Sequence, residues 1–257
     1  MAEDDVKLIE PVVGVAEDVP LGVSTKKDFN PEKWTPVTEL GKQVKAGKIT
    51  SIDTILDNGL RILEAEIVDF LLPDLQHDLL SIGQSKGKFG GGKKSIWRQT
   101  QKKTSEGNKP TFGAMVVVGN KNGYVGIGFG RAKETMPARE KALKNAKLNV
   151  IKIRRGCGSW ECVCGEPHSI PVKVRSRSGS VVFELSPAPR GANLSAEKEF
   201  AKILALAGVK DIYSHTFGQT RTKMNVLKSG FQALQKLSQV KIPPAYYKKG
   251  GVIEGGK

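Results

Sequence analysis

The sequence holds few of the side chains on which most enzymes depend. Its 257 residues include three histidines and three cysteines, and no serine stands in a G-x-S-x-G turn. The glycine-rich stretch at 126–130 fits neither the GxxxxGK(S/T) phosphate loop nor the GxGxxG dinucleotide fingerprint. We therefore expect a protein that is not an enzyme and has no small-molecule substrate.

Long hydrophobic runs are also missing. No segment approaches the roughly 18 apolar residues that a membrane-spanning helix needs. The first residues, MAEDDVKLIE, are acidic and lack the apolar core of a secretory signal. We therefore expect a cytoplasmic protein with no membrane partner, in a compartment where thiols stay reduced.

What the sequence has in excess is positive charge, and this charge is unevenly distributed. The formal net charge is +15. Residues 1–85 carry 8 Lys and Arg against 16 Asp and Glu, residues 86–155 carry 18 against 3, and residues 156–257 carry 15 against 7. A basic block inside a folded region is typical of a surface that faces phosphate groups. A solvated basic face without a partner is the alternative.

Periodicity and turn signals divide the chain into five parts. Residues 1–38 carry four prolines and scattered acids, which predict an acidic, extended leader. Residues 39–153 and residues 170–238 each combine strand and helix patterns and predict two α+β domains. Residues 154–169 form a cysteine-containing junction between them. Residues 239–257 are rich in Pro, Gly and Lys and predict a flexible basic tail.

The first domain combines antiparallel strands with a helix. Two β-rich runs flank GNKNG, where Asn122 and Gly123 favour a tight hairpin turn. A helix follows, and its apolar stripe is Ala138, Ala142, Ala146 and Val150. This order resembles a double-stranded-RNA-binding module. The strand glycines Gly119, Gly126, Gly128 and Gly130 leave room for another backbone or a phosphate to approach.

All three cysteines lie in the junction sequence RRGCGSWECVCGEPH. Cys157, Cys162, Cys164 and His168 make a Cys₃His set, which suits the four tetrahedral ligands of a structural zinc ion. Their spacing lacks the two-residue gap of a zinc knuckle, so reduced thiols in a loop are the alternative. A catalytic metal is not expected, because four protein ligands leave no open position.

Two long stretches resemble a known family. FGAMVVVGNKNGYVGIGFGRAKE and the following AREKALKNAKLNVIKIRRG resemble the first-domain signature of the universal small-subunit ribosomal protein S-five family. SGSVVFELSPAPRGANL and LALAGVKDIYSHTFGQTRTKMNVLKSGFQAL resemble its second domain. The resemblance covers roughly residues 40–238, and the cysteine-containing junction is similar to that of the archaeal branch. The acidic leader and the lysine-rich segment at 86–103 depart from the family core.

The resemblance implies an α+β protein with a double-stranded-RNA-binding-like first domain and a second domain of the S-five C-terminal βαβ type. It implies a structural role in the small ribosomal subunit, in contact with rRNA, with S-four and S-eight ribosomal proteins and with the mRNA entry region, and an influence on decoding accuracy. No cofactor is required apart from the candidate zinc ion. An RNA-binding or RNA-chaperone protein outside the ribosome, or a metal-dependent RNA-modifying enzyme, is the competing interpretation.

Lysine and arginine side chains would neutralise RNA phosphates largely independently of sequence. Most candidates lie in the lysine-rich segment, near the hairpin and helix start, and in the junction. The candidate RNA-binding residues are Lys86, Lys88, Lys93, Lys94, Arg98, Lys102, Lys103, Lys109, Lys121, Arg131, Lys133, Arg154, Arg155, Arg190 and Arg221.

Overall fold

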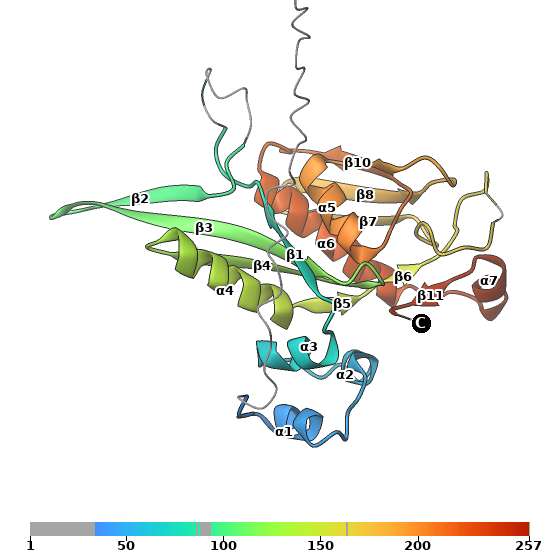
Figure 1. Cartoon of the computed structure of the whole chain (residues 1–257). Helices are drawn as coiled ribbons and strands as arrows, with labels where there is room; N and C mark the ends of the chain where they lie inside the picture. Colours follow the sequence, from blue (N-terminus) through green and yellow to red (C-terminus); the bar gives the residue numbers. More distant parts are fainter. Residues whose placement is uncertain (1–33, 86, 88–93, 163, 257) are drawn as a thin grey trace, which may run out of the picture.

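Residues 34–85, 87, 94–162 and 164–256 are described by the structure, a computed structural model of the chain (Figure 1). The leader predicted at 1–38 therefore lies almost wholly outside the described residues. In chain order the elements are α1 (Glu39–Lys45), α2 (Ile52–Asp57), α3 (Ala65–Leu71), β1 (Gln76–Leu80), β2 (Arg98–Thr104), β3 (Gly107–Gly119), β4 (Tyr124–Ala132), α4 (Thr135–Leu148), β5 (Val150–Lys152), β6 (Arg154–Arg155), β7 (Val174–Ser178), β8 (Val181–Pro187), β9 (Leu194–Ser195), α5 (Lys198–Ala207), β10 (Ile212–Phe217), α6 (Lys223–Gln239), α7 (Pro244–Lys249) and β11 (Ile253–Glu254).

The long strand β3 organises the first sheet. One edge of β3 pairs with β4, and β4 pairs in turn with β5. The other edge pairs with β2 over its first half and with β1 over its second half. All of these pairings are antiparallel. The half of β3 that pairs with β2 extends beyond the body of the domain as a two-stranded arm (Figure 1).

Close packing of α4 explains the glycines of β4. A Cβ atom added to Gly128 would lie 2.2 Å from the backbone oxygen of Ala142, and Gly126 and Gly130 meet the backbone of α4 at similar distances. The predicted helix is confirmed, and Ala138, Ala142 and Ala146 are fully buried against the sheet, whereas Val150, the last residue of the predicted stripe, begins β5. The strand glycines were expected to face either another backbone or a phosphate. In the structure Gly126, Gly128 and Gly130 face the backbone of α4.

The second domain is a four-stranded sheet in the order β7-β8-β10-β9. β9 runs parallel to β10 and connects to it through α5, which makes the expected βαβ unit. Alternating residues of β8 are buried under α5 and α6, where the rings of Phe183 and Phe200 lie 4.6 Å apart. Gly230 lets α6 approach, since a Cβ atom there would lie 2.2 Å from the Phe200 ring.

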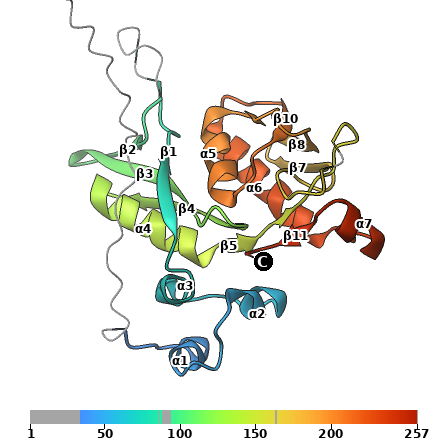
Figure 2. The same ribbon diagram turned by 45° about the vertical axis from the view of Figure 1, so that its right-hand side comes forward.

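The two sheets share one hydrophobic core. Met115, Val117 and Ile127 point from one face of the first sheet into a cluster that contains Phe200 and Leu204 of α5. The opposite face of the first sheet packs on α4 and on the N-terminal helices α1 to α3, which lie on the far side of the sheet from the second domain (Figure 2). The expected α+β fold with two successive domains is confirmed.

The composition of residues 239–257 predicts a flexible tail, whereas the chain forms α7 and β11 there. Pro244 stands at the first turn of α7, a position that tolerates its missing N–H. β11 pairs antiparallel with β6 of the junction, and Val252 is 9% exposed. The buried Val252 side chain and the pairing of β11 with β6 therefore hold the tail against the junction. None of the described helices is long and apolar enough to cross a membrane.

Candidate RNA-binding surface and metal centre

Four of the predicted RNA-binding residues share one face of the β2–β3 arm. Lys102 lies opposite Lys109, and Arg98 lies opposite Gly113, which in turn faces Arg131 on β4. Directly opposed residues in antiparallel strands point to the same side. We call Arg98, Lys102, Lys109 and Arg131 the arm face.

The side chains of the arm face are exposed, and hydrogen bonds hold Arg131 in place. Arg131 donates hydrogen bonds from Nη2 to the hydroxyls of Thr100 and Thr111, at 2.9 and 2.7 Å. Lys109 forms an exposed ion pair of 2.9 Å with Glu106. Such a pair is weak in water, so Lys109 can exchange it for a phosphate. Lys103 points to the opposite side of the arm.

The other candidates that the structure describes do not join this face. Lys133 precedes α4 and Arg221 precedes α6, and both are exposed. Lys94 lies near Lys223 and Glu197, and burial followed by the Lys223 charge lowers its pKa. Lys86, Lys88 and Lys93 lie outside the described residues. Arg190 is exposed and pairs with Glu166 at 3.2 Å.

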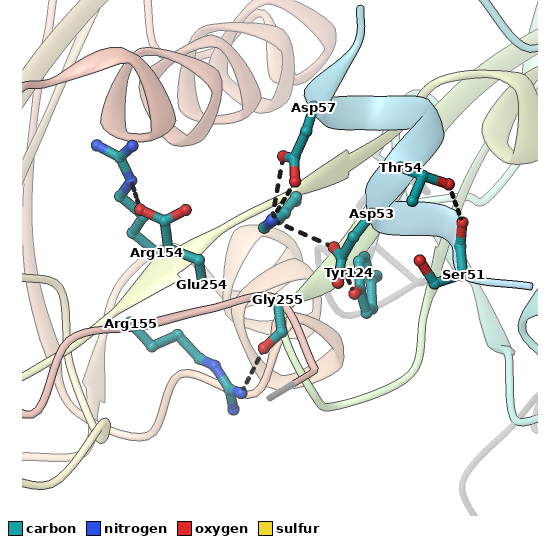
Figure 3. A network of polar contacts seen from close by, with 10 residues as sticks. Ser51, Asp53, Thr54, Asp57, Tyr124, Arg154, Arg155, Glu254 and Gly255 are labelled. Atoms are coloured by element: carbon teal, nitrogen blue, oxygen red, sulfur yellow. Dashed lines mark hydrogen bonds and ion pairs between the residues drawn. The ribbon is translucent and has the colours of Figure 1, made fainter. Parts of the chain in front are cut away.

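The junction arginines serve internal contacts. Arg154 pairs with Glu254 of β11 at 2.6 Å and donates to the Val240 carbonyl. Arg155 is 7% exposed and reaches the Gly255 carbonyl at 3.1 Å (Figure 3). Both were predicted to contact RNA from their charge alone. Arg154 is instead held by a carboxylate, because β11 pairs with the strand that carries it.

A polar network beside these arginines joins α2 to the first sheet. Lys152 of β5 lies 3.3 Å from Asp53 and 3.1 Å from Asp57. The Tyr124 hydroxyl donates to Asp53 at 2.8 Å, and burial with this bond raises the pKa of Tyr124 to about 12. Burial opposes protonation of Lys152, but its hydrogen bonds to Asp57 and Asp53 raise its pKa overall. No sequence pattern indicates this network, because its members are far apart along the chain.

The structure brings the Cys₃His set together. The ligand atoms of Cys157, Cys162, Cys164 and His168 all lie within 4.8 Å of one another. A tetrahedral zinc site with bonds of about 2.3 Å spaces its ligand atoms about 3.7 Å apart, so small shifts would complete the coordination. Among the described residues no other group of three or more His, Cys, Asp or Glu side chains is close enough to hold a metal.

His168 is oriented by an acidic partner that sequence reasoning missed. Its Nδ1 lies 2.9 Å from Oδ2 of Asp211, while its Nε2 faces Cys162 Sγ at 3.8 Å. Oδ1 of Asp211 accepts hydrogen bonds from the backbone of Gly191 and Asn193, at 3.1 and 2.8 Å. A carboxylate that fixes a histidine in this way is a regular feature of zinc sites. Asp211 lies 43 residues after His168, a separation at which sequence spacing gives no signal.

The thiols differ in how readily they lose a proton. A hydrogen bond from the Arg190 backbone, followed by one from the Cys164 side chain, lowers the pKa of Cys162 to about 6. Burial raises the pKa of Cys157 to about 11. Zinc binds thiolates and releases their protons as it binds, so zinc binding to these cysteines depends on pH. The donor types and their mutual distances fit a structural zinc ion.

Comparisons with known proteins agree with both domains in order. Residues 96–154 match the family model described as ribosomal protein S5, N-terminal domain, and residues 176–245 match ribosomal protein S5, C-terminal domain. The fold and these two matches define a two-domain ribosomal protein. The family is one of structural proteins and not of enzymes.

Individual relatives extend the match over most of the chain. The small ribosomal subunit protein uS5 of Nanoarchaeum equitans is 50% identical over 226 residues, which cover 88% of this chain and 97% of that protein. The uS5 protein of Methanocaldococcus jannaschii is 46% identical over 227 residues, 88% of this chain and 98% of its own length. The chain belongs to the ribosomal protein S5 family and is of the archaeal type.

Proposed function

We propose that this protein is a structural component of the small ribosomal subunit in the cytoplasm and binds rRNA through the arm face. The observation that carries the rRNA contact is the placement of four cations on one side of the sheet: Arg98, Lys102 and Lys109 lie on the projecting β2–β3 hairpin, and Arg131 lies on the adjacent strand β4. A narrow basic arm reaches phosphates that a flat surface cannot. Contacts of this kind position a protein on RNA without reading its sequence.

The neighbours and the role that we propose for this protein are those that its resemblance to the family implies. We propose contacts with S-four and S-eight ribosomal proteins and with mRNA near its entry, support of subunit assembly and a contribution to decoding accuracy. The predicted domain division also belongs to this proposal. It is supported by the end of β5 at Lys152 and the start of β7 at Val174, with the junction between them.

The salt dependence of rRNA binding tests the arm face. We expect the double variant Lys102→Gln, Lys109→Gln to lower the slope of log affinity against log salt by roughly 1 to 2, because each lost phosphate contact removes about 0.7–0.9. The matched control is Lys42→Gln, Lys48→Gln, which removes the same charge from exposed positions at and just after α1. An equal slope in the wild type and the arm variant would show that the arm face does not contact phosphate.

We also propose that Cys157, Cys162, Cys164 and His168 bind one structural zinc ion. The ion would hold the junction to the loop at Gly191–Asn193 through His168 and Asp211. Elemental analysis of purified protein should give one zinc per chain in the wild type. It should give none in Cys162→Ser and one in His215→Gln, whose histidine is exposed on β10. Wild-type protein without zinc, prepared under reducing conditions with zinc supplied, would contradict the proposal.

A further inference from the structure

A cavity of about 880 Å³ opens beside the junction, on the side of Arg155. The β3–β4 turn, the junction and the end of α5 contribute to its wall, with Lys121, Arg155 and Lys210 among the lining residues. It lies outside the arm face and has no part in the rRNA contact proposed above. Its volume is in the range of pockets that hold small organic ligands.

Arg155 brings a buried charge to this cavity, and no carboxylate in the described part of the chain pairs with it. Its Nη2 donates to the Asn122 side chain at 2.7 Å and to the Gly255 carbonyl, both neutral acceptors. Its Nε is buried and has no hydrogen-bond partner in the described chain. Nη1 faces Gly208, which also lines the cavity: a Cβ atom there would lie 2.9 Å from this nitrogen. A buried guanidinium without an anion is costly, so an anionic ligand would stabilise it.

The other charged residues of the cavity wall also favour an anionic ligand. Lys121 and Lys210 are exposed and form no ion pair with any residue that the structure describes. The one carboxylate of the cavity wall belongs to Glu166, which pairs with Arg190 at 3.2 Å. His168 turns its two ring nitrogens to Asp211 and Cys162. The cavity therefore has three cations whose charge no described carboxylate balances.

We infer that this cavity binds a phosphate group. Phosphate oxygens accept hydrogen bonds from the planar guanidinium of Arg155 and attract the mobile ammonium groups of Lys121 and Lys210. The cavity is larger than a phosphate ion alone, so the group would belong to a nucleotide or to an RNA backbone. If RNA supplies it, the inference deepens the proposed function by adding a second, buried RNA contact.

Titration of the full-length protein with inorganic phosphate at constant ionic strength tests the inference. Thermal stability of the wild type should rise with phosphate to a plateau, because a ligand of the folded state stabilises it. The variant Lys121→Gln, Lys210→Gln changes two exposed side chains and should weaken phosphate binding about tenfold or more. Arg155→Gln should abolish it if the variant folds. The arm variant Lys102→Gln, Lys109→Gln is the control and should bind phosphate as the wild type does.

Absence of a saturable phosphate response in the wild type overturns the inference, and so does unchanged phosphate binding by Lys121→Gln, Lys210→Gln.

Competition of phosphate binding with an RNA duplex and with a nucleoside monophosphate then identifies the molecule that supplies the phosphate group. Competition of the duplex with phosphate in the arm variant assigns the cavity to RNA, and competition by the monophosphate alone assigns it to a small ligand. A failed phosphate titration with a reduced salt slope for the arm variant refutes the cavity and leaves the proposed function standing.

Discussion

Replacement of Asp211 by asparagine tests how the candidate zinc site is built. A metal bound through Nε2 of His168 leaves the proton on Nδ1, which donates to Oδ2 of Asp211 at 2.9 Å. The asparagine oxygen can keep the two backbone hydrogen bonds from Gly191 and Asn193. Its NH₂ group then faces the Nδ1 proton of His168, and two donors cannot form a hydrogen bond. If the amide flips, its oxygen accepts from His168, but Gly191 and Asn193 lose their acceptor.

The expected loss follows from the role of such partners. Removing a carboxylate that orients a zinc-bound histidine typically costs 10–100-fold in metal affinity, or about 1.4–2.8 kcal/mol. Asp211 and His168 are both buried, so water cannot replace the lost bond, and we expect the upper part of this range. Competitive titration of zinc with a chelator measures the affinity. Glu106→Gln is the control, because it removes one exposed carboxylate from the arm turn. Wild-type zinc affinity in Asp211→Asn would show that Asp211 does not orient a zinc-bound histidine.

Two further predictions concern stability. Gly128→Ala should lower the free energy of unfolding by about 3 kcal/mol, because the new methyl group meets α4 backbone at 2.2 Å; calorimetry should show Tm reduced by roughly 5–10 °C. Gly87→Ala is the control, because no described residue lies within 4 Å of a Cβ atom added there, and an equal Tm change in both variants would contradict the packing argument. The Tyr124 hydroxyl, whose pKa burial and the Asp53 bond raise from 10.0 to about 12, should contribute stability in full below pH 10 and lose it as pH rises to 12. Tyr124→Phe should therefore show a smaller decline in unfolding free energy between pH 9.5 and 11.5, by about 1–2 kcal/mol in urea titrations; identical declines would exclude this contribution.

Local patterns predicted most of the fold. The alanine stripe of α4 and the strand alternation of β8 appear in the structure as expected, because their periods follow directly from helix and strand geometry. For the glycines of β4, the sequence pattern allowed either a backbone or a phosphate as the close neighbour. The choice depends on where α4 returns to the sheet, and a local pattern does not contain that information.

The sites were harder to predict, because charge alone does not say what a side chain meets. Cys157 and His168 were found as candidate ligands because they are close in sequence. Asp211 was missed because only the fold brings it to His168. For Arg154 the charge pattern indicated a phosphate contact, and it contained no sign of Glu254, which the pairing of β11 with β6 brings to this arginine.

Sedimentation of a native cell lysate shows whether the protein is bound to the small ribosomal subunit. Small ribosomal subunits and free proteins separate in a sucrose gradient, and the protein can be detected in each fraction with an antibody. We expect the protein to co-migrate with the small subunit and to leave that position when ribonuclease digests the rRNA. A protein that stays at the top of the gradient, in the fractions of free proteins, would contradict it.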